Sequence, residues 1–256
     1  MPAPKNETPV IVAFTLDFET GGLKCQDCAC TQIAIHAVRI DTFEVIDRYV
    51  TYITPYNKQI DKTPGKRKVL RSKYEQQEGV PMLYEDKALT YSAITMDMLE
   101  RMGKDIVVVA QEVVEFIKKN TLSKGRNMKP FLIGQNIGFD IGFLQQLMEY
   151  GGQSAEFAKL MRGTVDFYGN FQPLYVDTIV LGQFALCTQP DMNSYKLEIM
   201  AERLGVELDD AHDADADVTA TTNVAMVCAK RMRNADGGDG VMTIAKKEKS
   251  RSHFKI

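Results

Sequence analysis

Apolar and polar positions divide the chain into an early part with strand-like patterns and a later part with helix-like patterns. Val10–Leu16 is a run of mostly apolar, β-prone residues, which predicts a buried strand. Gln32–Arg39 alternates between apolar and polar residues, and Phe43–Ile53 has the pattern of another strand. The short link Asp41-Thr42 between them is typical of an antiparallel hairpin. The first part of the chain is therefore predicted to form a three-stranded meander.

The later part alternates between helical periodicity and short apolar strands. Thr95–Lys119 has apolar residues at three- and four-residue steps, which predicts one helix capped by Thr95, although Gly103 weakens its middle. Further helices are predicted at Ile141–Tyr150, Tyr195–Leu204 and Asp213–Arg231, and brief strands at Phe131–Gly134 and Tyr175–Asp177, the latter running into Thr178–Leu186. A meander followed by alternating helices and short strands predicts a mixed α/β sheet in a single domain.

Composition and charge place the chain among ordinary globular proteins. Its 256 residues are 45% hydrophobic, which provides ample core for one large domain or two small ones. We find no apolar run of membrane-spanning length and no apolar region of a secretory signal near the N-terminus. Five cysteines without an export signal favour reduced thiols. We therefore expect a cytoplasmic protein with no membrane contact. The net charge of -3 neither favours nor excludes nucleic acid.

Three segments are predicted to lie outside the core domain, which we place at residues 10–232. Residues 1–9 are proline-rich and are predicted to form a disordered lead-in, and residues 233–256 are predicted to form a flexible basic tail. The third segment is a basic insertion at about residues 55–89, with seven lysines and arginines between positions 58 and 73 and tyrosines around them. Such a loop suits a phosphate backbone and stacked bases, and a solvated insertion is the alternative. Its candidate nucleic-acid contacts are Lys66, Arg67 and Lys68.

Three thiols, Cys25, Cys28 and Cys30, lie within six residues. A structural zinc site usually requires four ligands in paired sets, and Cys187 and Cys228 stand alone in the sequence. Free thiols in a loop are therefore the preferred interpretation, and a zinc site is the alternative.

Two carboxylates follow the first predicted strand directly. Alternate side chains of an extended segment share a face, so Asp17 and Glu19 are predicted to point the same way and Phe18 the other way. Adjacent carboxylates repel each other, and a bound hard cation relieves that repulsion. A polar strand end facing solvent is the alternative for this pair alone.

Further acids stand where predicted strands and helices meet. Asp140 opens a helix after Phe131–Gly134, a position that dipole and capping effects also favour, and Asp177 ends a short strand. Near the last helix, His212 precedes three acids, of which Asp217 is five residues away. A histidine there could accept a proton beside a metal ion.

Three motifs, F-T-L-D-F-E-T-G-G-L, G-Q-N-I-G-F-D-I-G-F-L and A-H-D-A-D-A-D-V-T-A-T, occur in this order. With the linking segments A-I-T-M-D-M-L, V-D-T-I-V-L and K-L-E-I-M-A-E-R-L-G, they resemble the DEDDh (DnaQ-like) 3′→5′ exonucleases. That family includes the proofreading epsilon subunit of bacterial DNA polymerase III. The resemblance covers about residues 10–230 and implies a ribonuclease H-like fold.

The resemblance also implies a catalytic set consisting of Asp17, Glu19, Asp140, His212 and Asp217. In such enzymes the carboxylates hold two Mg²⁺ or Mn²⁺ ions about 4 Å apart. Asp17 would bridge both ions, Glu19 and Asp217 would complete one site, and Asp140 would support the other through water. His212 would take the proton from the attacking water, and the terminal nucleotide would leave as a 5′-monophosphate.

The expected substrates are 3′ ends of single-stranded DNA, with RNA as the alternative, and a DNA polymerase or replisome component is a candidate partner. The expected substrate-binding residues of the motifs are Phe18, Thr20, Gly21, Thr95, Asn136 and Phe139. Two positions depart from the family pattern: Gln135 stands where a histidine is common, and Thr20-Gly21-Gly22-Leu23 replaces the usual T-T-G-L. A catalytically idle module that binds nucleic acid or a polymerase is the competing hypothesis, against which the complete catalytic set argues.

Overall fold

The computed structural model describes residues 9–59, 79–189, 191–208 and 214–233. Its main sheet consists of β1 (Val12–Thr20), β2 (Cys30–Arg39), β3 (Val45–Tyr52), β4 (Phe131–Gly134) and β7 (Tyr175–Asp177). The strand order is β3-β2-β1-β4-β7. Neighbours in β3-β2-β1 are antiparallel, whereas β4 runs parallel to both β1 and β7. The predicted mixed sheet and its N-terminal meander are therefore confirmed.

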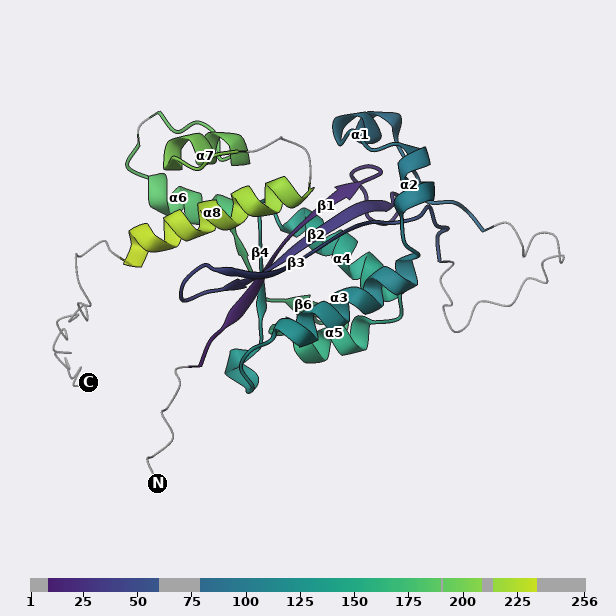
Figure 1. The fold of residues 1–256 in the computed structure, drawn as a ribbon, viewed down its shortest axis with the longest axis horizontal. Coiled ribbons are helices and arrows are strands. Elements are labelled where there is room, and N and C mark those ends of the chain that lie inside the picture. Colours follow the sequence, from purple (N-terminus) through teal and green to yellow (C-terminus); the bar gives the residue numbers. More distant parts are fainter. Residues whose placement is uncertain (1–8, 60–78, 190, 209–213, 234–256) are drawn as a thin grey trace, which may run out of the picture.

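Helices cover both faces of the sheet (Figure 1). One face carries α3 (Ile106–Asn120), α4 (Gly138–Tyr150) and α5 (Ser154–Leu160), and the other carries α6 (Thr178–Leu186), α7 (Leu197–Leu204) and α8 (Ala214–Arg233). The main core lies on the α3–α4 side, where Phe14, Leu16 and Phe18 of β1 pack with apolar residues of these helices. On the opposite face, small residues such as Ala13 let α8 lie close to the sheet.

The single helix predicted for Thr95–Lys119 is wrong, because the chain forms α2 (Met96–Met102) and α3 with an extended link between them. Gly103 is extended, and a Cβ there would lie 2.5 Å from the backbone nitrogen of Thr54. Lys104 N–H donates to Tyr52, and Thr54 N–H donates to Lys104. The helix is interrupted because the backbone beyond β3 pairs with this link.

Several other bounds differ from the sequence-based prediction. β1 continues past Leu16 through both acids to Thr20, because it keeps pairing with β2. Three elements had no predicted counterpart in the sequence: α5, the 3₁₀ turn Arg126–Met128, and the hairpin of β5 (Gly163–Val165) and β6 (Phe171–Pro173). Among the described residues, no helix is long and apolar enough to cross a bilayer.

The predicted basic insertion at about residues 55–89 is not wholly outside the core. Its last part forms Leu83–Glu85, which pairs with the loop after β1, and then begins α1 (Asp86–Tyr91). Residues 60–78, with Lys66, Arg67 and Lys68, lie outside the described residues, as do the lead-in up to residue 8 and the tail from residue 234.

Candidate active site

The two acids of β1 occupy the sheet face opposite the main core. Asp17 and Glu19 alternate with Leu16 and Phe18, which are buried in that core. Asp17 pairs across the sheet with Ala34 of β2, which packs against α8. The shared face predicted for Asp17 and Glu19 is therefore observed.

The first turn of α8 brings a third carboxylate to this pair. Oxygen atoms of Asp17, Glu19 and Asp217 lie within 4.8 Å of one another, although 198 to 200 positions of sequence separate the last from the first two. Ala214 and Val218 make this approach possible, since both pack on the small side chain of Ala34. Among the described residues, these three carboxylates are the one group of potential metal ligands close enough together to bind a single ion.

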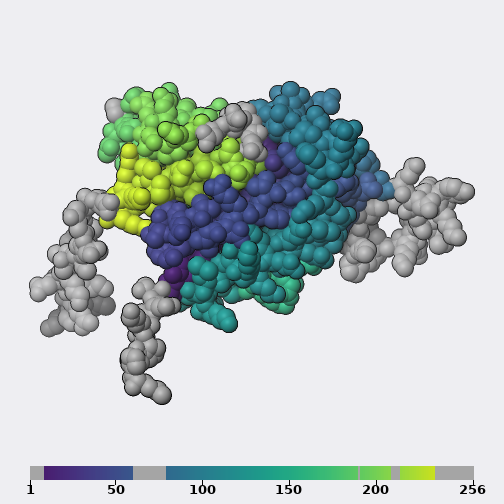
Figure 2. Space-filling view, in the orientation of Figure 1, coloured from purple at the N-terminus to yellow at the C-terminus, as the bar shows by residue number. Residues whose placement is uncertain are grey.

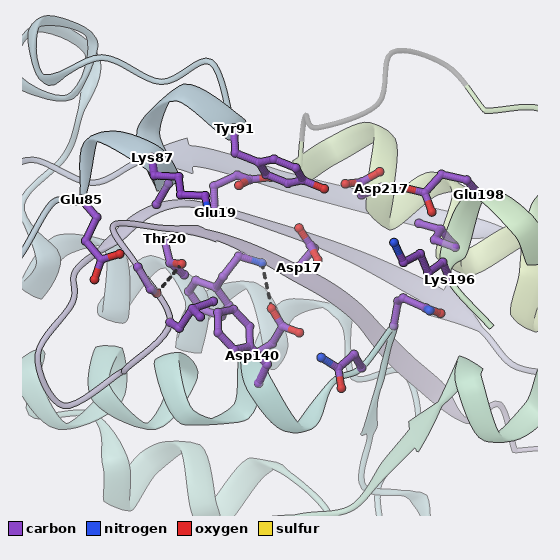
Figure 3. A pocket seen from close by; sticks show the side chains of 18 of the residues that line it. Asp17, Glu19, Thr20, Glu85, Lys87, Tyr91, Asp140, Lys196, Glu198 and Asp217 are labelled. Carbon is purple, nitrogen blue, oxygen red and sulfur yellow. Dashed lines mark hydrogen bonds between the residues drawn. The ribbon is translucent and has the colours of Figure 1, made fainter. Parts of the chain in front are cut away.

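Asp140 approaches from below the end of β1, on the first turn of α4 (Figure 3). Its side chain is 3% exposed, and its Oδ1 accepts a hydrogen bond of 3.1 Å from the backbone N–H of Phe18. Burial and the neighbouring Asp17 raise the pKa of Asp140 well above its usual range. The Phe18 N–H acts in the opposite direction and fixes the position of the carboxylate.

The same crowding perturbs Asp17. Burial and then the charge of Asp217 raise the pKa of Asp17 to about 7. Carboxylates whose ionised forms are disfavoured by burial and mutual repulsion are stabilised by a cation between them. A donor set made only of carboxylate oxygens suits hard ions such as Mg²⁺ and Mn²⁺. The residues present therefore fit a divalent metal site.

The acids open into a cavity of about 710 Å³ (Figure 3). Its polar and charged lining comes from Asp17, Glu19, Thr20, Glu85, Lys87, Tyr91, Gln135, Asn136, Asp140, Lys196, Glu198 and Asp217. Lys87 and Lys196 stand on separate walls, formed by α1 and by the residue before α7. A cavity with acids in its middle and lysines on its walls can hold metal ions and a phosphorylated ligand together.

The segment leading into α1 explains one departure from the family pattern. Gly21 N–H donates to Ala29, and Glu85 N–H donates to Gly21. A Cβ on Gly21 would lie 2.5 Å from the carbonyl oxygen of Leu83. A larger residue at position 21 is excluded because the returning chain covers it, and the wall of the cavity is built from α1 instead.

The second departure, Gln135, has a structural position of its own. Its Nε2 donates to the backbone oxygen of Tyr195 over 2.9 Å, and its Oε1 accepts from the hydroxyl of Thr178 over 2.5 Å. Thr178 is fully buried at the start of α6. Gln135 thus fixes the backbone next to Lys196 to the end of β4.

The predicted substrate-binding residues divide into three groups. Phe18, Thr20, Asn136 and Phe139 line the cavity. Thr95 instead caps α2, accepting from the N–H of Met98, and Gly21 lies behind the wall rather than among the lining residues. His212, Lys66, Arg67 and Lys68 lie outside the described residues.

Five further polar and charged residues line the cavity but were not predicted from the sequence: Glu85, Lys87, Tyr91, Lys196 and Glu198. A signal was present for the last two, since they begin the segment K-L-E-I-M-A-E-R-L-G that links the motifs. Nothing in the local pattern around Lys87 indicated that α1 would fold back over the first motif.

The cysteines do not form a metal site among the described residues. Cys30 is buried and its thiol donates to the side-chain oxygen of Gln146 over 3.4 Å, while Cys28 faces Glu85 at 3.9 Å. No described group of three metal-ligating side chains includes a cysteine. All five cysteines are free thiols, as preferred from the sequence.

The fold agrees with the comparisons to known proteins. The RNase_T exonuclease family matches residues 73–225, more than half of the chain, and this protein belongs to that family of DEDD-type exonucleases. The match begins after β1, so Asp17 and Glu19 lie N-terminal to it. The resemblance to the DnaQ-like exonucleases is thereby confirmed.

Two curated relatives are PolC-type DNA polymerases III. The one from Clostridium perfringens is 23% identical over 94% of this chain, and the one from Oceanobacillus iheyensis is 25% identical over 80%. The chain spans only 14% and 10% of their lengths.

Solved structures of exonuclease I share the fold. The Escherichia coli enzyme in complex with a dT13 oligonucleotide superposes with a TM-score of 0.59 at 19% identity, covering 88% of this chain and 42% of that one. The enzyme from Methylocaldum szegediense gives 0.58 at 17% identity, covering 88% and 41%.

Proposed function

We propose that this protein is a metal-dependent 3′→5′ exonuclease that removes nucleoside 5′-monophosphates from single-stranded DNA. The observation that carries the proposal is the meeting of Asp17, Glu19 and Asp217 within 4.8 Å at the cavity into which Asp140 also opens. Membership of the exonuclease family gives these acids a chemistry. The curated relatives, which are DNA polymerases, and the exonuclease I complex with a DNA oligonucleotide favour DNA over RNA.

In the proposed mechanism, Asp17, Glu19 and Asp217 would hold a divalent metal ion, and Asp140 would support a second one. Two ions, Mg²⁺ or Mn²⁺, would stabilise the charge on the attacking and leaving oxygens of an in-line displacement. His212 accepts a proton from the attacking water. The phosphorus forms a bond to the water oxygen and loses its bond to the 3′ oxygen. That oxygen takes up a proton from solvent and becomes the 3′-hydroxyl of the shortened strand, and the terminal nucleotide is released as a 5′-monophosphate.

The walls of the cavity supply the proposed contacts to the strand. Lys87 and Lys196 are placed to neutralise non-bridging phosphate oxygens that the central acids would repel. Asn136 has a left-handed backbone with φ 54°, and Asp177 accepts its N–H over 3.1 Å. This arrangement holds the Asn136 side chain at the cavity, where we place the terminal nucleotide.

The test is digestion of 5′-labelled single-stranded DNA and RNA of the same sequence with Mg²⁺, with Mn²⁺ and with chelator. We expect a ladder that shortens from the 3′ end, is abolished by chelator, and is lost in Asp17→Ala and in His212→Ala. Asp47→Ala serves as the control, because Asp47 pairs with Lys119 outside the cavity. Binding of the oligonucleotide without degradation would contradict the proposal and indicate an idle binding module.

A further inference from the structure

A buried histidine joins β2 to the first turn of α8. His36 is fully buried, and its Nε2 lies 2.6 Å from Oδ1 of Asp215, a residue 179 positions away. Arg48 is the cross-strand partner of His36 on β3, and its guanidinium lies 3.8 Å from the other oxygen of Asp215. Both oxygens of one α8 carboxylate therefore face adjacent residues of the sheet. On the molecular surface, α8 borders these strands (Figure 2).

In the hydrogen bond between His36 and Asp215, the histidine is the donor and the carboxylate is the acceptor. Burial lowers the pKa of His36, which favours the neutral imidazole with one N–H. A carboxylate only accepts, so Nε2 carries the proton and donates it to Asp215. The other ring nitrogen, Nδ1, has no hydrogen-bond partner among the described residues. Among the described residues, the one polar contact of the His36 side chain is therefore with α8. An apolar residue could fill the same buried position but could not make this contact.

The contact lies beside the packing that places Asp217. Ala34, two residues before His36 on the same face of β2, packs against Ala214 and Val218 of α8. Ala34 is also the cross-strand partner of Asp17. Contacts between small apolar groups permit sliding of a helix, whereas a short hydrogen bond fixes its rotation and its position along the axis. Asp215 is fixed in this way two residues before Asp217.

We propose that His36 and Asp215 are positioning residues that set Asp217 against Asp17 and Glu19 for divalent-cation binding. The inference rests on the proposed function, since it assumes that these acids bind the metal. In this proposal Asp215 has a structural role in the metal site, in addition to the favourable interaction of an acid with the first turn of a helix. The supporting partners of metal ligands commonly change metal affinity or activity by about 10–100-fold when removed.

The test measures Mg²⁺ binding to the full-length protein by calorimetry and the Mg²⁺ dependence of DNA digestion. We expect His36→Leu and Asp215→Ala each to raise the half-saturating Mg²⁺ concentration by about tenfold. His36→Gln and Asp215→Asn keep a donor and an acceptor, respectively, and should return most of the affinity. The double variant His36→Leu/Asp215→Ala should be no weaker than the weaker single variant.

Asp47→Ala is the matched control, because it removes the ion pair between β3 and Lys119 of α3 together with a part-buried hydrogen bond from Asn120. A purely structural role would lower the unfolding temperature of the control and of the Asp215 variants without changing their Mg²⁺ half-saturation. That result would overturn the inference. Asp215 is 35% exposed, so its variants test the inference even if His36→Leu does not fold.

The two proposals fail in different ways. A wild-type protein that binds Mg²⁺ but degrades neither DNA nor RNA would contradict the proposed function, while the calorimetric comparison would still decide the positioning role. Wild-type digestion with unchanged Mg²⁺ half-saturation in Asp215→Ala would overturn the positioning role alone. A wild-type protein that binds no Mg²⁺ would overturn both.

Discussion

Replacing Asp17 by asparagine should stabilise the metal-free protein while removing its response to metal. Asp17 has a pKa of about 7 in the folded protein, against a usual value of 3.8. Between these values the folded state binds a proton that the unfolded state has lost. The stability of the metal-free protein therefore falls as pH rises through this window and stays low above it. Asparagine carries no charge and escapes this loss.

The size of the effect follows from the shift. The pKa of Asp17 is about 3 above its usual value, and each pKa unit corresponds to about 1.4 kcal/mol. The free energy of unfolding lost above pH 7 is therefore at most about 4 kcal/mol. Asp17 is partly exposed to the open cavity, so solvent screening reduces the expected gain to about 1–2 kcal/mol. For a protein of this size the gain corresponds to a rise in unfolding temperature of roughly 2–8 °C.

The assay is thermal and urea unfolding at pH 8 in chelator, repeated with Mg²⁺. Mg²⁺ should raise the unfolding temperature of the wild type and leave Asp17→Asn unchanged, because a ligand stabilises only a state that binds it. Asp47→Asn should behave in the opposite way in chelator, since Lys119 and Asn120 hold the pKa of Asp47 below its usual range. An Asp17→Asn protein no more stable than wild type in chelator would refute the electrostatic reasoning.

Three further variants test the walls of the site and the basic segment. Gly21→Ala should destabilise the protein by roughly 1–3 kcal/mol in urea unfolding, because its methyl group meets the Leu83 carbonyl; Gly138→Ala, with open space around it, should not. Lys196→Met should raise KM for oligonucleotides in steady-state digestion and reduce the logarithmic salt slope of binding by about one. Neutralising residues 66–68 together should weaken nucleic-acid binding in a filter or anisotropy titration and flatten its salt dependence, and an unchanged slope would show that this segment does not contact phosphate.

The local pattern of apolar and polar residues was sufficient to predict those elements whose conformation depends on residues close in sequence. Alternation in Gln32–Arg39 and the acids after Val10–Leu16 predicted the meander and the shared face of Asp17 and Glu19, because the two-residue period of a strand is local. The motifs also indicated that Asp140 and Asp217 belong to the same site, through resemblance rather than through any pattern near them.

Features that depend on contacts between distant segments were not predictable in this way. The break at Gly103 follows from pairing with the backbone after β3, and the position of α1 follows from its approach to Gly21. The bond between His36 and Asp215 is of the same kind, since Asp215 is indistinguishable in sequence from an ordinary acid of a first helical turn.

The most direct test of the metal-dependent site is a crystal structure with Mn²⁺ and a single-stranded oligonucleotide, recorded with anomalous scattering. We expect a Mn²⁺ peak coordinated by oxygens of Asp17, Glu19 and Asp217, a second peak on the Asp140 side, and the 3′-terminal phosphate at the two ions. A cavity without anomalous signal at saturating Mn²⁺, or ions bound only elsewhere, would contradict the assignment of these acids.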